Sequence, residues 1–113
     1  MNDITMTAVQ VALRGLSLRQ RAIADNIANV ETPGFLANRV DFEDSLRNAI
    51  AGRDPGSGAA STRKSLDATN LSGNNVKLDD EIVTLVDTNL RYQLGIEAAN
   101  AKFRLLRSAI KGQ

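Results

Sequence analysis

Two apolar stripes at seven-residue spacing, one near each end of the chain, constrain the fold more than any other feature. Each stripe alternates steps of three and four residues, which keeps its side chains on one edge of a helix. The first stripe consists of Met6, Val9, Leu13, Leu16, Gln20, Ile23, Ile27 and Val30. The second consists of Ile82, Leu85, Asn89, Tyr92, Ile96, Ala99, Phe103, Leu106 and Ile110. Because a helix with one narrow apolar edge needs a partner, we expect the two ends of the chain to depend on each other.

Turn signals delimit the first half of the chain. An N-terminal helix is expected within residues 1–30, because Thr32-Pro33-Gly34 follows it and a proline disfavours helix in the residue before it. Gly34 is expected to adopt a positive φ there. Residues 31–51 are expected to hold this turn and then a short amphipathic helix, in which apolar side chains recur every four residues at Phe42, Leu46 and Ile50.

Residues 52–77 are rich in small and polar side chains, with Leu66 and Leu71 as the only large apolar residues between Gly52 and Asn75. Little burial is available to offset the entropy of ordering, so a flexible loop is expected. A C-terminal helix is expected over 78–111. Acidic residues occupy its first turn and basic residues its last turns, which is the charge order that the helix dipole favours. An alternative explanation is that the basic residues form a docking patch for acidic neighbours; they are Lys102, Arg104, Arg107 and Lys111.

These elements predict an all-α single subunit over residues 1–113, in which the two long terminal helices pack as a coiled pair and the middle segment is irregular and partly mobile. Four aromatic residues and no Trp indicate a small core. Gln20 and Asn89 interrupt the two apolar stripes, and they either fix the register of the pair or are simply exposed.

Composition excludes several classes of function. A net charge of +1, from 14 basic and 13 acidic side chains without a long basic run, gives no general attraction to nucleic acid. The absence of His and Cys removes thiol and imidazole chemistry, and the consecutive carboxylates of Asp79, Asp80 and Glu81 point in different directions around a helix. No catalytic, cofactor-binding or metal-binding residue is therefore expected. Residues 1–7 carry neither a positive leader nor a continuous apolar block, so neither a cleaved signal peptide nor a membrane-spanning helix is expected there.

One run of residues resembles a known signature. Residues 24–35 (ADNIANVETPGF) are similar to the N-terminal motif of bacterial flagellar rod, hook and hook-associated axial proteins. Three C-terminal runs, 74–81, 89–92 and 102–110, add a resemblance to a proximal subunit of the flagellar basal-body rod. The resemblance covers about residues 8–42 and 74–112.

The resemblance implies a structural subunit that self-assembles with other rod proteins into a hollow helical drive shaft, which transmits torque and surrounds the export channel. It also implies contact with the ring-rod junction protein and the membrane ring. Passage through the flagellar type III export apparatus, without a cleaved signal peptide, would deliver the chain to the basal body, where the rod spans the periplasm. No cofactor and no nucleic acid are implied.

The residues expected in subunit contacts combine both stripes with the turn. Asn26 and Asn29 either end the helix by satisfying free backbone groups or serve the interface, and Phe35 is either a plug for the local core or an anchor in a neighbour. The full set is Val9, Leu13, Leu16, Ile23, Asn26, Ile27, Asn29, Val30, Thr32, Pro33, Gly34, Phe35, Ile82, Leu85, Asn89, Tyr92, Ile96, Phe103, Leu106 and Ile110.

A second function is compatible with the stripes alone. A soluble cytoplasmic adaptor can use a helical hairpin of this kind to bind an amphipathic partner. An enzyme is a distant third hypothesis, because only carboxylate or lysine chemistry remains available and no pair of such groups lies at a convincing pocket spacing.

Overall fold

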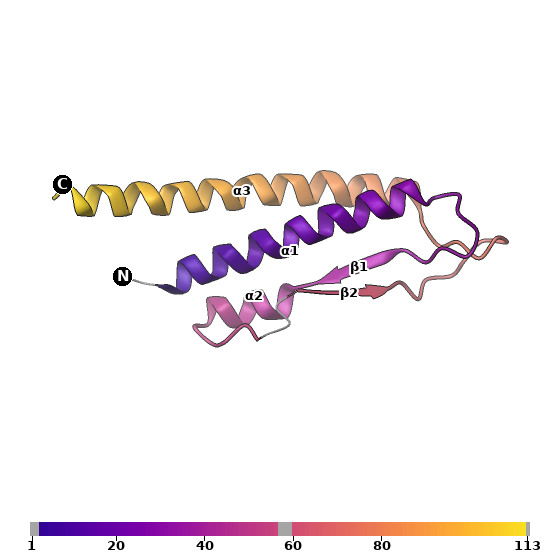
Figure 1. Cartoon of the computed structure of the whole chain (residues 1–113), viewed down its shortest axis with the longest axis horizontal. Coiled ribbons are helices and arrows are strands. Elements are labelled where there is room, and N and C mark those ends of the chain that lie inside the picture. Colours follow the sequence, from indigo (N-terminus) through magenta and orange to yellow (C-terminus); the bar gives the residue numbers. More distant parts are fainter. Residues whose placement is uncertain (1–2, 57–59, 113) are drawn as a thin grey trace.

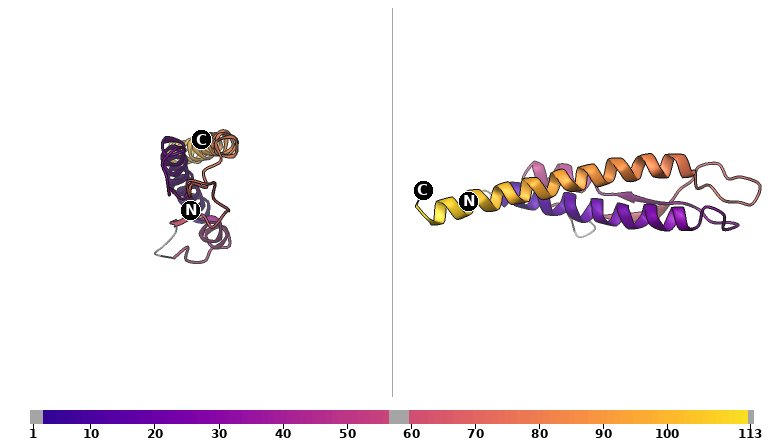
Figure 2. Two further views of the ribbon diagram at one scale, coloured as in Figure 1. Left: turned by 90° about the vertical axis from the view of Figure 1, so that its right-hand side faces the viewer. Right: turned by 90° about the horizontal axis from the view of Figure 1, so that it is seen from above.

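The computed structural model describes residues 3–56 and 60–112, which form an elongated molecule with extents of 64 × 25 × 14 Å. Two long helices lie side by side and antiparallel, with both chain ends on the same side of the molecule (Figures 1 and 2). The elements in chain order are α1 (Asp3–Ala28), β1 (Asn38–Asp41), α2 (Glu43–Ile50), β2 (Ser61–Lys64) and α3 (Leu78–Ile110). The expectation of two long terminal helices in contact is confirmed. Among the described residues, no helix is both long and apolar enough to cross a membrane.

The edge of α3 that faces α1 differs in part from the predicted stripe. Leu85, Tyr92, Ala99 and Leu106 of that stripe are half-buried, as expected. The other buried or half-buried positions of this edge lie one residue before those predicted, at Glu81, Thr88, Gly95 and Lys102. Small side chains explain the shift at two of these positions, because Thr88 is 1% exposed and Leu13 of α1 approaches Gly95 where a side chain would otherwise stand.

The two polar interruptions of the stripes meet across the helix pair. Gln20 Nε2 donates a hydrogen bond of 2.7 Å to Asn89 Oδ1. The bond lies at the exposed side of the helix pair, because Asn89 is exposed. The two amides therefore meet, as the register hypothesis requires, while Asn89 is also accessible to water, as the alternative expected.

The middle of the chain contains a two-stranded sheet, so the all-helical prediction was wrong there. β1 and β2 are antiparallel, and their register runs from Asn38 opposite Lys64 to Asp41 opposite Ser61. β2 lies within the 52–77 segment that was expected to be irregular. All four of its side chains are exposed, so it carries none of the apolar alternation that marks a strand in a sequence.

A small core forms where the sheet and α2 pack on the middle of α1. Leu16, Val40 and Phe42 are buried together, with Leu46 and Tyr92 packed against them. Phe42 precedes α2, and its ring lies over Gly15 of α1, where a methyl group would overlap the ring carbons. The close approach of this ring therefore requires a glycine at position 15.

Arg19 of α1 holds the start of α2 in place. Its guanidinium lies 4.7 Å from the centre of the Phe42 ring and 2.9 Å from a carboxylate oxygen of Glu43, and it also donates to the Val40 carbonyl. Burial alone would raise the pKa of Glu43, but hydrogen bonds from Arg19 and the Phe42 amide, with the Arg19 charge, outweigh it and hold that pKa below its ordinary value. Glu43 therefore remains ionised while paired.

Candidate assembly interface

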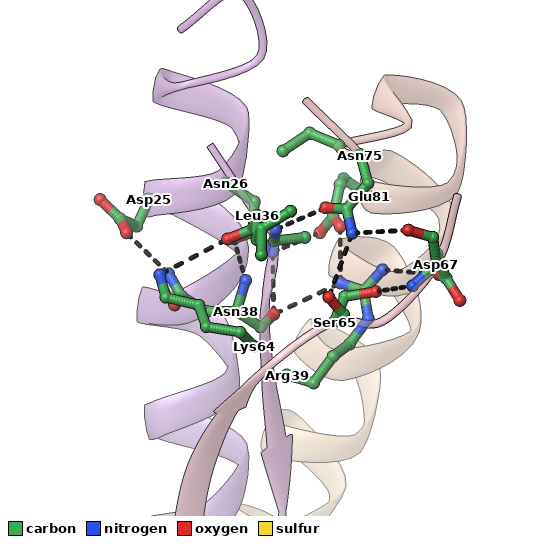
Figure 3. A network of polar contacts seen from close by, with 12 residues as sticks. Asp25, Asn26, Leu36, Asn38, Arg39, Lys64, Ser65, Asp67, Asn75 and Glu81 are labelled. Atoms are coloured by element: carbon green, nitrogen blue, oxygen red, sulfur yellow. Dashed lines mark hydrogen bonds and ion pairs between the residues drawn. The ribbon is translucent and has the colours of Figure 1, made fainter. Parts of the chain in front are cut away.

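The asparagine junction is the polar cluster where the end of α1, the start of β1 and the start of α3 meet (Figure 3). We define it by four buried side chains, each at most 3% exposed: Asn26, Asn74, Asn75 and Glu81. Within the described part of the chain, no buried side-chain nitrogen or oxygen lacks a hydrogen-bond partner. The junction is therefore a fully satisfied polar network, the form in which buried polar groups add order.

Asn26 joins α1 to both β1 and α3. Its Oδ1 accepts a 2.7 Å hydrogen bond from the Asn38 amide, and its Nδ2 donates 3.0 Å to the Asn38 carbonyl. The side-chain amide thus pairs with the backbone of β1 much as a neighbouring strand would. The same Nδ2 lies 3.2 Å from Glu81 Oε2 on α3.

Asn75 makes the equivalent connection one residue earlier in the chain leading to β1. Its Oδ1 accepts from the Ala37 amide at 2.7 Å, while its Nδ2 donates to the carbonyls of Ser65 and Asp67 at 3.2 and 3.1 Å. These bonds fix the segment after β2, which the sequence predicted to be a flexible loop. Hydrogen bonds, rather than apolar burial, supply its contacts.

Asn74 caps the C-terminal end of α1 through its side-chain amide. Its Nδ2 donates to the carbonyls of Asn29 and Thr32, at 2.9 Å each. Carbonyl groups just after a helix have no partner within the helix, so a donor supplied from elsewhere satisfies them. Asn29 itself bonds locally, to the Asp25 carbonyl at 2.8 Å, which agrees with the helix-ending interpretation of that residue.

Glu81 is the buried charge of the junction and is paired. Arg39 of β1 lies 2.9 Å from Glu81 Oε1, and the other guanidinium nitrogen lies 3.8 Å from Asp67 Oδ2. A buried carboxylate is tolerable because this charged partner and the Asn26 amide neutralise and satisfy it. The first turn of α3 is thereby held against β1.

Gly34 lies in the turn after α1 and has a φ of +74°, which confirms the predicted positive torsion. Its amide donates 2.8 Å to the Ser72 carbonyl, so the turn contacts the segment just before the junction. No atom lies within 4 Å of the place where a Cβ would stand. A substitution there acts through backbone strain alone.

We expect Gly34→Val to lower the free energy of unfolding by about 1–2 kcal/mol, the cost of a β-branched residue in the left-handed region. Gly34→Asn is the matched control, because asparagine tolerates this region better and should lose clearly less. Urea unfolding followed by circular dichroism measures both. Equal stability of Gly34→Val and the native chain would contradict an obligatory left-handed turn.

The outer face of α3 is the second candidate surface. We define it by Ile82, Val83, Val86, Leu90 and Leu94, which are 47–69% exposed. From Val83 onward they recur at steps of three or four residues, with Ile82 beside Val83. Leu94, at the rim of this face, also lines a pocket with Leu16 of α1 and Leu46 of α2. Large exposed aliphatic side chains in a contiguous row are typical of a surface that another protein covers.

The predicted contact residues divide into three groups. Leu16, Ile23 and Asn26 are buried within the chain, so they position other residues. The half-buried group is Val9, Leu13, Ile27, Asn29, Val30, Phe35, Leu85, Tyr92 and Leu106. The exposed group is Thr32, Pro33, Gly34, Ile82, Asn89, Ile96, Phe103 and Ile110.

Several residues of these surfaces were not predicted. Asn38, Arg39, Asn74, Asn75 and Glu81 were not assigned to a site, and neither were the outer-face residues Val83, Val86, Leu90 and Leu94. One signal was available for the junction, since Asn74-Asn75 stands in a polar segment directly before a helix start and repeats the amide chemistry of Asn26 and Asn29. Phe35, left open by the sequence, is half-buried with the Lys64 ammonium 5.0 Å from its ring centre.

The asparagine junction and the outer face of α3 both carry groups suited to holding protein segments together rather than to catalysis. Within residues 3–56 and 60–112, no cluster of three or more acidic side chains is arranged to hold a metal ion. The junction carries amides already bonded to backbone groups, and the outer face is aliphatic. Such groups stabilise a fold and an interface.

Comparison with known proteins shows which proteins this chain is similar to. Residues 9–35 match the family model described as flagella basal body rod protein. The flagellar basal body rod protein FlgB of Borrelia hermsii is 31% identical over 118 residues, covering 85% of this chain and 87% of the relative. FlgB of Borreliella burgdorferi is 30% identical with the same coverage, and FlgB of Salmonella typhimurium is 28% identical over 97% of this chain and 95% of the relative.

Proposed function

Since this chain belongs to the FlgB family of flagellar basal body rod proteins, we propose that it is a proximal rod subunit that self-assembles with other rod proteins into a hollow helical drive shaft. Proteins of this family are structural, and the chain is a structural subunit of the flagellar basal body rod rather than an enzyme. The shaft would transmit torque and surround the export channel. The resemblance of residues 24–35 and the similarity to FlgB relatives support this assignment.

The outer face of α3 is the observation that carries the proposal of self-assembly. α3 already uses one edge against α1, yet Val83, Val86 and Leu94 remain 62–69% exposed on another side. Covering one such aliphatic side chain is worth about 1.5–3 kcal/mol. A subunit in a tube has neighbours on several sides, and one of these neighbours can cover the outer face of α3.

The asparagine junction supports the mechanical part of the proposal. α1 and α3 run along the 64 Å axis of the subunit, and the junction ties the C-terminal end of α1 and the N-terminal end of α3 to β1. A load applied to one helix therefore reaches the other through short, fully paired hydrogen bonds. Many such subunits in parallel would form a stiff shaft.

The proposed partners follow from the family. They are copies of this chain, other rod proteins, the ring-rod junction protein, the membrane ring and the type III export apparatus, through which the chain would pass to reach the periplasm-spanning rod. Segment 52–77, whose junction residues are already bonded within the chain, is proposed to gain further contacts from neighbours in the assembly. The twenty predicted contact residues remain proposed contacts, with the exposed ones facing neighbours directly.

Deletion of the gene tests the function. We expect cells that are non-motile and lack external filaments, with both restored by the native gene. A complementing gene with Val86→Lys and Leu90→Lys should fail, because two charges on the outer face oppose burial of that face. The control is Thr62→Lys, an exposed position of β2, which should complement. Filaments on the deletion strain would overturn the rod assignment and favour the cytoplasmic adaptor.

A further inference from the structure

The two edges of the small sheet differ in how their backbone groups are satisfied. β1 lies between α1 and β2, so β2 is the outer strand (Figure 1). On the α1 side of β1, Asn26 bonds to the amide and carbonyl of Asn38, and the Arg19 guanidinium donates to the Val40 carbonyl at 2.6 Å. Side chains of α1 therefore cover this edge of the sheet.

The opposite edge of the sheet is formed by β2 and the residues that follow it. Successive residues of an antiparallel strand face the paired strand and the opposite side alternately. The Ser65 amide donates 2.7 Å to the Ala37 carbonyl, so Ser65 faces β1, and its neighbour Lys64 and the alternate residue Thr62 face away. Leu66 also faces away, because the Asn75 side chain takes the carbonyls on either side of it.

We call residues 62–66 the free edge. The amides and carbonyls of Thr62, Lys64 and Leu66 have no hydrogen-bond partner among residues 3–56 and 60–112. All four side chains of β2 are exposed, and Leu66 is 94% exposed. The free edge thus offers a row of three donors and three acceptors to a further strand.

Natural sheet edges are protected from pairing by a covering helix or loop, by proline or a bulge, or by charge. Among the described residues, the protection of the free edge comes from charge, through Arg63 and Lys64. A charged edge rejects strands of like charge and accepts strands of opposite charge. The charges therefore indicate which kind of strand the free edge can take.

Arg63 and Lys64 differ in whether their charge is neutralised. Arg63 Nε lies 2.8 Å from Asp41 Oδ2, so this charge is paired within the sheet. The Lys64 ammonium donates to Asn38 Oδ1 at 2.7 Å and lies 5.0 Å from the centre of the Phe35 ring, and no carboxylate of the described residues is within ion-pair distance of it. An acid on the added strand, opposite Lys64, would complement this cation.

A second copy of this chain does not supply that acid. If two free edges paired antiparallel along their whole length, Lys64 of one copy would stand directly opposite Lys64 of the other. Like charges directly opposite each other destabilise a sheet. The free edge is therefore suited to a segment of different sequence.

We propose that the free edge of β2 binds an extended acidic segment of another protein by antiparallel strand addition. Antiparallel pairing extends the pattern already present in the sheet. From its N-terminus, the segment carries an apolar side chain opposite Leu66, an acid opposite Lys64 two residues later, and a β-branched side chain opposite Thr62 after two more. The contact lies in the middle of the chain and uses neither α1 nor α3.

A peptide of this pattern tests the proposal. The probe is acetyl-Thr-Ile-Thr-Glu-Thr-Val-Thr-amide, in which Ile, Glu and Val stand opposite Leu66, Lys64 and Thr62. When the probe is added to the full, nitrogen-labelled chain up to about millimolar concentration, it should shift the amide NMR signals of these three residues in a saturable way. The absence of shifts, or shifts confined to other parts of the chain, would overturn the proposal.

Methylation of the probe backbone shows whether strand pairing holds the complex together. In the proposed pairing, the amides of Ile, Glu and Val point toward β2, and those of the intervening Thr residues point away. Methyl groups on the first three amides should weaken binding at least about tenfold, because three hydrogen bonds are lost. Methyl groups on the intervening amides are the control and should have less than about a twofold effect. Equal affinities of the two methylated probes would exclude strand addition.

Two substitutions at position 62 test the same contact from the side of the protein. Thr62→Pro removes an amide that faces away from β1, so β1 and β2 can still pair while binding of the probe falls at least about tenfold. Thr62→Lys keeps this amide and should bind the probe within about threefold of the native chain. Circular dichroism verifies that both variants are folded. Undiminished binding by a folded Thr62→Pro variant would contradict the proposal.

Charge exchange tests the choice of an acidic partner. Lys64→Glu should weaken binding of the probe about tenfold at low salt, and a probe with Lys in place of Glu should restore it. The control Arg53→Glu, a surface change outside the sheet, should have no effect. Insensitivity to Lys64→Glu would contradict the requirement for an acid.

A titration of the chain without the probe tests the alternative occupant. If the amide signals of Thr62, Lys64 and Leu66 alone shifted as the chain concentration rose, the free edge would pair with a second copy, and the acidic partner would be wrong. None of these binding results bears on the rod assignment, because that assignment depends on filaments and motility in the deletion strain.

Discussion

Asn26→Ala is expected to lower the free energy of unfolding by about 3 kcal/mol, one of the two largest effects we predict for a single substitution in this chain. The substitution leaves the Asn38 amide and carbonyl without partners and removes a donor from Glu81. Asn26 is fully buried, so water does not readily replace the lost bonds. Chemical denaturation followed by circular dichroism measures the change.

Asn29→Ala is the matched control for this prediction. It stands three residues later, just after the end of α1, and has the same side chain, but its amide bonds only to Asp25 in the last turn of the helix and to Thr32 in the turn that follows. We expect a loss of about 1 kcal/mol or less. If the two alanine variants were equally stable, the junction would not hold α1, β1 and α3 together.

Gly15→Ala is expected to destabilise the chain by about 2–4 kcal/mol, although alanine favours helices over glycine by about 1 kcal/mol. A methyl group at this position would overlap Cγ and both Cδ atoms of Phe42. The ring is 5% exposed and belongs to the core with Leu16 and Val40, so its displacement opens that core. Thermal unfolding of the purified variant measures the loss.

Gly95→Ala separates packing from helix propensity. Its new methyl group would lie 2.8 Å from Leu13 Cδ2, the mobile end of a flexible side chain that can rotate away. The gain in helix propensity should therefore make Gly95→Ala neutral or more stable by up to about 1 kcal/mol. A stabilised Gly15→Ala variant would show that Phe42 does not lie over α1 in solution.

The long helices could be predicted because their signal is local and repeated. Steps of three and four residues recur over about eight turns, and Pro33 with Gly34 marks where the first helix must stop. Even there, the sequence did not reveal which of two adjacent edges of α3 would face α1. That choice depends on the small side chains of Thr88 and Gly95, which an apolar pattern ignores.

The sheet and most of the asparagine junction could not be predicted because their contacts are distant in sequence and polar. β2 exposes all four of its side chains, and Asn75 bonds to Ala37, 38 residues away. Propensity and hydropathy treat such asparagines as loop residues. Asn26 was recognised as a candidate contact through the family resemblance and its helical spacing, but its partners on β1 and α3 became visible only in the structure.

The chemistry of the asparagine junction has a consequence for the conditions in which the subunit can work. Carboxamide groups neither gain nor lose a proton in the range that proteins experience, and their hydrogen bonds are not screened by dissolved ions as exposed ion pairs are. The bonds that Asn26, Asn74 and Asn75 make to backbone groups therefore persist when the pH or the salt concentration changes. Such a network suits a structural subunit whose two long helices have to keep their relative position in changing conditions.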